Sequence, residues 1–195
     1  MTVLLAVGDD YWGARAEAIA ASYSHVCVAV DRSGGLGRAL RLVARGSIPL
    51  PAAISMFAAA HSLPSSRPNT SQSFTSNPDL RDLAASKRAS LIVLFRAGLI
   101  ISGTTLDGYK VTNVHCADIN GFGGLASIWR ALKAGAVKQC ATLHEVTNRI
   151  DEGNVLDTEP YLLDRTSSYA KNEYAAYQAG LRLLDRTLAL TKSEQ

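Results

Sequence analysis

The sequence is poor in cysteine, in net charge and in long apolar runs, and each shortage excludes a class of protein. Its three cysteines are odd in number and far apart, so we expect no disulfide framework and a reducing cytoplasm as the natural location. A net charge of +3 on 195 residues is too small to indicate binding to nucleic acid. No apolar run approaches the roughly 20 residues of a membrane span, and no basic segment precedes the apolar start, so neither a membrane partner nor a signal peptide is expected.

The composition and the order of the segments predict one folded α/β domain over residues 1–195. Hydrophobic residues make up 47% of the chain, which is enough for a substantial core. Apolar runs at 2–7 and 25–30 read as buried strands, and helix-prone stretches follow each of them. In the second stretch Leu36, Leu40 and Val43 form one apolar stripe. Strand and helix thus alternate, which predicts a Rossmann-like, mostly parallel twisted sheet with helices on both faces.

The rest of the chain continues the pattern after an interruption. Residues 48–61 suggest one short helix, and the polar, turn-rich residues 62–78 predict a long surface loop, with a substrate lid as the alternative. We expect a helix from 78 to about 87, strands at 90–95, 110–115, 137–146 and 155–163, and a helix from Leu125 that Gly135 closes. The final helix, about 168–191, has apolar positions at helical spacing that should pack into the core: Tyr174, Tyr177, Leu181, Leu184 and Leu188.

Residues able to do chemistry concentrate between Asn113 and Asp151. Asn113 and His115 would lie two apart at the end of one strand, so their side chains should point to the same face. Ligands of open α/β sheets bind outside the carboxyl ends of the strands. His144 belongs to the following strand, and Asp151 to the loop after it. A lone histidine at a strand end is more often a satisfied polar residue than a catalyst, so the pattern around it decides.

That pattern resembles the formyltransferase family, which moves a formyl group from 10-formyltetrahydrofolate to an amine. The family motif is Asn-x-His at a strand end, followed about three dozen residues later by Asp within Ile-Asp-x-Gly-x-Ile-Leu. Here Asn113-Val114-His115 precedes Arg149-Ile150-Asp151-Glu152-Gly153-Asn154-Val155-Leu156, with 38 positions between Asn113 and Asp151. Segments 127–135, 142–145 and 179–184 resemble the neighbouring family elements. The resemblance extends from about 90 to 190 and is weak before that.

The resemblance implies the formyltransferase fold and a role for each residue of the motif. Formyl transfer passes through a tetrahedral oxyanion, which Asn113 and His115 would stabilise. Asp151 would orient the imidazole, raise its pKa and accept the amine proton. The pterin of the folate would lie between two loops, one after the fourth strand and one around the aspartate. These cofactor residues would be Phe95, Arg96, Ala97, Gly98, Leu99, Ile100, Val146, Thr147, Asn148, Arg149, Ile150 and Gly153.

Departures from the family pattern concern the amine acceptor. The family usually follows its histidine with Pro-Ser-Leu-Leu-Pro and later Arg-Gly, but here segment 116–124 is different and glycine-rich. An acidic turn follows the first strand, where it would repel a phosphate and could attract a cationic amine. No residues are spaced as a zinc site, so no metal is expected. Candidates for contact with the acceptor are Asp9, Asp10, Tyr11, Asp118 and His144.

Three functions therefore remain in comparison. The tRNA-modifying members of the family carry a further C-terminal domain, so we expect a compact transferase that acts on a small amine, such as an amino sugar or a modified amino acid. A hydrolase that releases formate from 10-formyltetrahydrofolate is the first alternative, and a non-catalytic folate-binding relative is the second. Neither a Gly-x-Ser-x-Gly turn nor a Gly-x-Gly-x-x-Gly fingerprint is present, which disfavours a serine hydrolase and a dinucleotide enzyme. The acceptor and the oligomeric state stay open.

Overall fold

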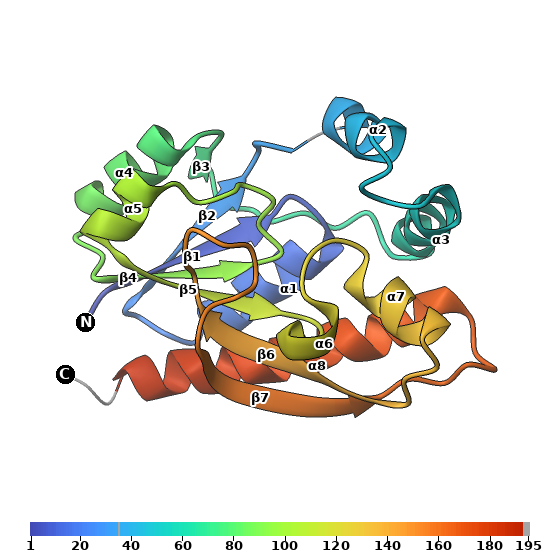
Figure 1. Cartoon of the computed structure of the whole chain (residues 1–195). Coiled ribbons are helices and arrows are strands. Elements are labelled where there is room, and N and C mark those ends of the chain that lie inside the picture. The colour runs from blue at the N-terminus through green and yellow to red at the C-terminus, as the bar shows by residue number, and fades with distance from the viewer. Residues whose placement is uncertain (35, 193–195) are drawn as a thin grey trace.

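The computed structural model describes residues 1–34 and 36–192. Along the chain its strands and helices are β1 (Val3–Gly8), α1 (Tyr11–Ala20), β2 (Val26–Asp31), α2 (Leu36–Ala44), α3 (Leu50–His61), β3 (Ser73–Phe74), α4 (Asn77–Ser86), β4 (Leu91–Phe95), α5 (Gly103–Gly108), β5 (Lys110–His115), α6 (Ile119–Phe122), α7 (Ser127–Lys133), β6 (Lys138–Glu145), β7 (Val155–Leu162) and α8 (Tyr169–Lys192). Figure 1 traces this order.

The described strands form one sheet in the order β3-β2-β1-β4-β5-β6-β7. Pairings from β3 to β5 are parallel, whereas β6 and β7 join antiparallel. The inner strands β1 and β4 are buried along their whole length, as the continuous apolar runs predicted. The α/β, mostly parallel architecture is therefore confirmed. One consequence matters for the site: β5 and β6 run side by side, so Asn113 lies directly opposite His144.

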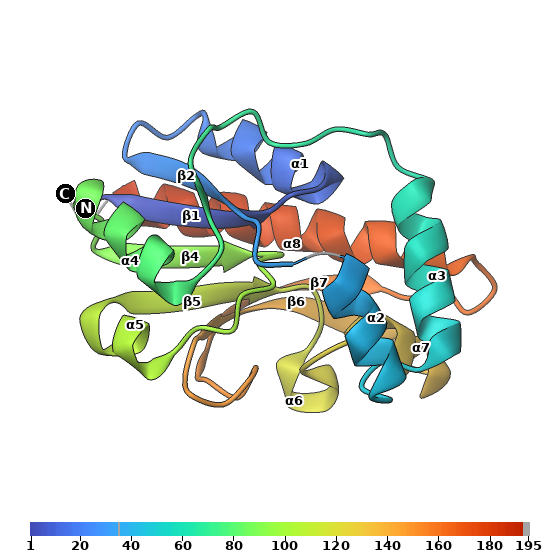
Figure 2. The ribbon, with the colours of Figure 1, turned by 90° about the horizontal axis from the view of Figure 1, so that it is seen from above.

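Helices cover both faces of the sheet (Figure 2). On one face α1 and α8 bury Trp12, Ala16 and Leu184 against alternate residues of β1, β4 and β5. On the other face α4 and α5 pack on Leu4, Ile92 and the remaining alternate residues. Val111 belongs to this second face, and because side chains alternate along a strand, Asn113 and His115 also point to it.

Helices α2 and α3 stand beyond the carboxyl ends of the strands and pack against α7 (Figures 1 and 2). In α2 the stripe predicted from the sequence is wrong at Leu40, which is 69% exposed, whereas Val43 packs as predicted, together with Leu42, against Ile48 of the neighbouring turn. The side chain of Leu36 lies outside the described residues. In α8 the predicted stripe is buried from Leu181 onward, whereas Tyr177 is half-buried and Tyr174 is 42% exposed.

The expectation of a long surface loop over 62–78 is also wrong in part. Phe74 is buried in β3, which pairs with β2, and Ser76 caps α4. The carboxylate of Glu17 on α1 accepts hydrogen bonds from the amides of Asn69 and Thr70, at 2.6 and 2.8 Å. These contacts tie the segment to the body of the protein along its length. No described helix is long and apolar enough to cross a membrane.

Candidate active site

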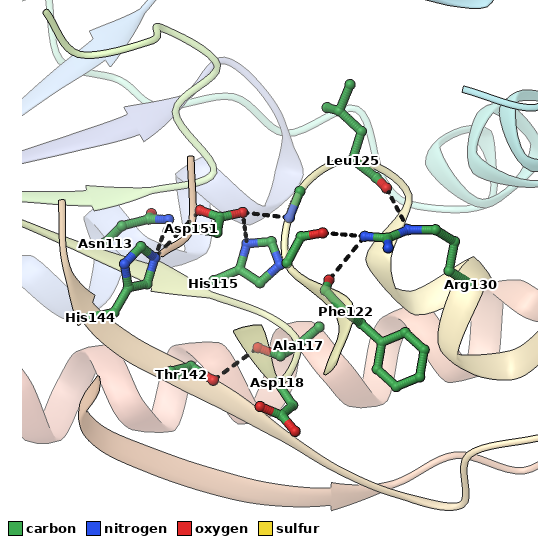
Figure 3. Close-up of polar contacts among 12 residues, drawn as sticks. Asn113, His115, Ala117, Asp118, Phe122, Leu125, Arg130, Thr142, His144 and Asp151 are labelled. Carbon is green, nitrogen blue, oxygen red and sulfur yellow. Dashed lines mark hydrogen bonds and ion pairs between the residues drawn. The ribbon is translucent and has the colours of Figure 1, made fainter. Parts of the chain in front are cut away.

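Asn113, His115, His144 and Asp151 meet at the carboxyl end of β5 (Figure 3). The Oδ2 atom of Asp151 lies 3.4 Å from Nδ1 of His115, and its Oδ1 atom lies 3.5 Å from Nε2 of His144. Nδ2 of Asn113 lies 3.1 Å from the same Nε2 atom. The predicted amide, imidazole and carboxylate are thus brought together from one strand and one distant loop, with a second imidazole behind them.

His115 has a buried ring whose two nitrogens differ in their surroundings. Nδ1 faces the carboxylate of Asp151, so in the neutral ring the proton lies on Nδ1. Nε2 is buried, carries the lone pair and has no hydrogen-bond partner among the described residues. Burial lowers the pKa of His115 below its ordinary value and outweighs the opposing effects of Asp151 and of the Phe122 backbone, while the charges of His144 and Arg130 lower it further. Asp151 thus raises the pKa of this imidazole, as expected, but burial outweighs its effect.

Asp151 is held as a carboxylate in an unusual backbone conformation. Burial raises its pKa, but the hydrogen bond with His144, the nearby His115 and the backbone amide of Gly124 together lower the pKa to about 2. The Gly124 amide donates to Oδ2 at 2.7 Å. The φ angle of Asp151 is +53°, a left-handed conformation that aspartate and asparagine adopt more readily than most residues. Asp151 is thus ionised at neutral pH.

His144 supports the site from behind. Its side chain is 2% exposed, and its Nδ1 donates to the backbone carbonyl of Glu145 at 2.8 Å. In the neutral ring Nε2 then accepts from Asn113, and in the protonated ring it donates to Asp151. Because this side chain is enclosed, the suggestion that His144 contacts the acceptor is corrected to a contact with the other site residues.

The two loops predicted to hold the pterin lie close together. Ala97, Leu99 and Val146 pack against the same apolar cluster, and a Cβ atom at Gly103 would come within 3.6 Å of Asn148. Ile100 and Ile150 are 61% and 62% exposed, so apolar surface is available there.

Two of the twelve predicted cofactor positions, Phe95 and Arg96, have side chains that are not available to a pterin. Phe95 is fully buried in the core, and Arg96 turns away to ion-pair with Asp10, so the structure corrects both. Gly153 has a structural reason to be glycine, since a Cβ atom there would lie 1.8 Å from the carbonyl oxygen of Glu145. The remaining loop positions are Gly98, Thr147, Asn148 and Arg149, which are exposed.

Sequence reasoning missed the residues that hold the first of these loops in place. Asp31, at the end of β2, is 6% exposed, and its Oδ2 accepts hydrogen bonds from the amides of Gly98 and Leu99 at 2.6 and 2.7 Å. Asn77 accepts from the amide of Ser102 and donates to the carbonyl of Ile100. An aspartate that directly ends a buried strand was the one signal in the sequence that could have indicated such a role.

The residues predicted to face a cationic acceptor are engaged elsewhere. Asp9 pairs with Arg67 at 2.8 Å and with Arg32 at 3.9 Å. Asp10 caps α1 through the amide of Gly13 and also pairs with Arg96. Arginines therefore neutralise this acidic turn, which is a correction to its expected role as an amine-binding pair.

The remaining acceptor candidates make their side-chain hydrogen bonds outside the cluster. Tyr11 accepts a long hydrogen bond from Arg15 on α1. Asp118 caps α6 by accepting from the amide of Asn120, and in Figure 3 its side chain points away from Asp151. Among the described residues, no group of three or more His, Cys, Asp or Glu side chains is placed to hold a metal ion. Two surface hollows, of about 290 and 800 Å³, lie beside α7 and α1 and do not include the site.

Comparison with known proteins gives the same family as the motif. The family model described as formyl transferase matches residues 26–176. This chain belongs to the formyl transferase family. It is similar to methionyl-tRNA formyltransferase of Pseudomonas entomophila, with 28% identity over 153 residues that cover 72% of this chain and 48% of that protein. The chain spans about half the length of the curated relatives that it matches.

Solved structures of the family share the fold at low identity. Phosphoribosylglycinamide formyltransferase from Anaplasma phagocytophilum superposes with a TM-score of 0.68 at 17% identity, covering 100% of this chain and 89% of that one. A formyltetrahydrofolate deformylase from Pseudomonas syringae pv. tomato gives a TM-score of 0.66 at 17% identity, covering 96% of this chain and 59% of that one. Transferases and a deformylase therefore use this fold.

Proposed function

We propose that this protein is a formyltransferase that moves the formyl group of 10-formyltetrahydrofolate to a primary amine of a small molecule. The observation that carries the proposal is the meeting of Asn113, His115 and ionised Asp151 in one cluster, with Asp151 against Nδ1 of His115 and Nε2 of that ring left without a hydrogen-bond partner among the described residues. This arrangement supplies one lone pair, one amide donor and one fixed negative charge. Acyl transfer between two nitrogens needs a group that relocates a proton and a donor that stabilises the oxyanion, and the fixed charge supports the first of these.

His115 moves the proton in this proposal. When the amine nitrogen attacks the formyl carbon, a C–N bond forms and the nitrogen becomes cationic. Nε2 of His115 takes a proton from that nitrogen and returns it to the folate nitrogen as the old C–N bond breaks, so protons balance over the cycle. The carboxylate of Asp151 holds the proton on Nδ1 and stabilises the imidazolium that forms transiently.

Asn113 stabilises the negative oxygen of the tetrahedral intermediate. Its Nδ2 group carries two N–H bonds, of which His144 engages one, so the second is available to an oxyanion. The cross-strand pairing of Asn113 with His144 fixes the direction of that donor. This assignment shifts the oxyanion role predicted for both residues onto Asn113, and it gives His115 the role of base.

The pterin would lie between segments 97–100 and 146–150, which belong to the two loops proposed from the sequence. Support comes from the proximity of the two segments and from exposed Ile100 and Ile150. An aromatic ring bound there would cover that apolar surface. The small net charge of the chain does not provide the basic surface that tRNA binding relies on, which favours a small acceptor, such as an amino sugar or a modified amino acid.

A hydrolase is the second candidate, because a formyltetrahydrofolate deformylase shares the fold and the same base could activate water. Purified protein is incubated with formyl-labelled 10-formyltetrahydrofolate, with and without a panel of amino sugars, amino acids and methionyl-tRNA. We expect label in an amide product with one of the small amines. Release of labelled formate at equal rates with and without amines would support the hydrolase instead, and product with methionyl-tRNA alone would contradict the acceptor class.

A further inference from the structure

Arg130, on α7, contacts none of the catalytic side chains, yet its guanidinium group lies against the loop that touches Asp151 (Figure 3). Nε donates to the carbonyl of Leu125 at 3.1 Å, and Nη2 donates to the carbonyls of Phe122, at 3.2 Å, and Gly123. These carbonyls stand on both sides of Gly124. A planar guanidinium presents several donors in fixed directions, so one side chain can hold a loop at several points.

The loop needs this support because its backbone is irregular between α6 and α7. Gly124 has a φ angle of +82° and Ala126 one of +53°, both left-handed. A Cβ atom at Gly123 would lie 3.0 Å from the carbonyl oxygen of Ile119 and 3.2 Å from Cβ of Asp151. The segment therefore passes very close to Asp151 and lacks the regular hydrogen bonding that would fix it unaided.

The contact between this loop and the site is the Gly124 amide, whose 2.7 Å hydrogen bond is the shortest polar contact that the described residues make with Asp151. Both imidazoles are farther away, at 3.4 and 3.5 Å. The amide therefore determines which way the carboxylate points, and Arg130 determines where the amide lies. The charge of Arg130 also lowers the pKa of His115.

We propose that Arg130 is a positioning residue, which fixes loop 122–125 so that the Gly124 amide holds Asp151 between its two imidazoles. The expected effect on kcat rests on the proposed function, whereas the expected effect on the position of the Gly124 amide does not. It also gives a reason for the altered segment 116–124: the two glycines bring the loop backbone up to Asp151, and the arginine one turn into α7 clamps that backbone.

The test compares Arg130→Met and Arg130→Lys with Lys133→Met, which removes a positive charge from the same helix without a contact to the loop. Because misplacement of a catalytic group by about 1 Å can cost on the order of 100-fold, we expect Arg130→Met to lower kcat about 100-fold with KM for the folate changed less than about threefold. Arg130→Lys keeps the charge but cannot span three carbonyls, so we expect kcat to fall about tenfold. Lys133→Met should resemble the wild type.

Two further readouts separate positioning from a general loss of structure. In Arg130→Met, which removes a charge near His115, the acid limb of the kcat/KM profile should move to higher pH, but in Arg130→Lys it should stay in place. Amide hydrogen exchange at Gly124 should be at least tenfold faster in both variants, and this readout holds even if the protein has no transferase activity. Unchanged kcat and unchanged Gly124 exchange in Arg130→Lys would overturn the proposal, and that conservative variant decides the matter if Arg130→Met does not fold.

Discussion

Replacement of Asp151 by asparagine tests the chemistry while leaving the shape of the site nearly unchanged. The carboxylate faces Nδ1 of His115 at 3.4 Å and keeps the proton on that nitrogen, so that Nε2 is free to act as a base. An amide can instead donate to Nδ1 and favour the other tautomer, which places the proton on Nε2. The equivalent substitution in a histidine–aspartate catalytic pair costs about 10⁴-fold, so we expect kcat to fall by roughly 10³- to 10⁴-fold.

The same substitution should cost little stability. The pKa of Asp151, lowered from 3.8 to about 2, corresponds to roughly 2 kcal/mol of preference for the ionised form in the folded state, which sets the order of magnitude of what asparagine removes. Asparagine also tolerates the left-handed backbone at this position. Because the folded-state pKa is depressed, the stabilisation by the wild-type carboxylate is complete above the unfolded value of 3.8 and is lost as the pH falls toward 2.

The assay is tetrahydrofolate release under saturating 10-formyltetrahydrofolate, with thermal unfolding of each variant measured in parallel. Glu152→Gln is the matched control, because Glu152 is the neighbouring carboxylate and its side chain is 60% exposed. We expect the control to keep wild-type turnover. A folded Asp151→Asn protein with turnover within about threefold of the wild type would refute the assigned role of the carboxylate.

Three further predictions follow from particular contacts. Because burial lowers the pKa of His115, kcat/KM should fall only when the pH drops below the pKa of a free imidazole, which is 6.5. An acid limb above pH 6.5 would contradict a neutral base. Gly153→Ala should destabilise the protein by about 3 kcal/mol or more, since its Cβ would lie 1.8 Å from a backbone oxygen, whereas Gly108→Ala, where the space is open, should cost less than about 1 kcal/mol by thermal unfolding. Asp31→Asn weakens the hydrogen bonds that anchor the 97–100 loop. Calorimetry with a folate analogue that lacks a transferable formyl group should therefore show a Kd about tenfold higher, with kcat little changed. An unchanged Kd would remove that loop from the cofactor site.

Local sequence pattern predicted the regular elements well because they obey simple periodicities. Continuous apolar runs identified the buried strands, and apolar residues at helical spacing identified the final helix. The errors arose where long-range contacts decide the outcome. Segment 62–78 looks like a loop because its residues are polar, yet Glu17 and β2 fix it in place, and neither partner is visible from the segment itself.

In the site, the motif identified the three residues that meet but not their protonation. Proximity of Asp151 suggested a raised pKa for His115, whereas the structure shows that burial outweighs it. Asp10 was expected to meet a substrate, but Arg96 reaches it from the end of β4. Arg130 carries no local signal, since an arginine near the end of a helix is ordinary; its importance depends on three carbonyls that only the folded chain places within reach.

The most direct test of the account is a single-turnover experiment with 10-formyltetrahydrofolate labelled in the formyl group, run with the acceptor panel on the wild type and on Asn113→Ala, His115→Ala and Asp151→Asn. The account predicts that the wild type transfers label to a small primary amine and that each variant is slowed by at least about 100-fold. Wild-type protein that binds the folate but never transfers or releases the label, or variants that all react at the wild-type rate, would contradict it.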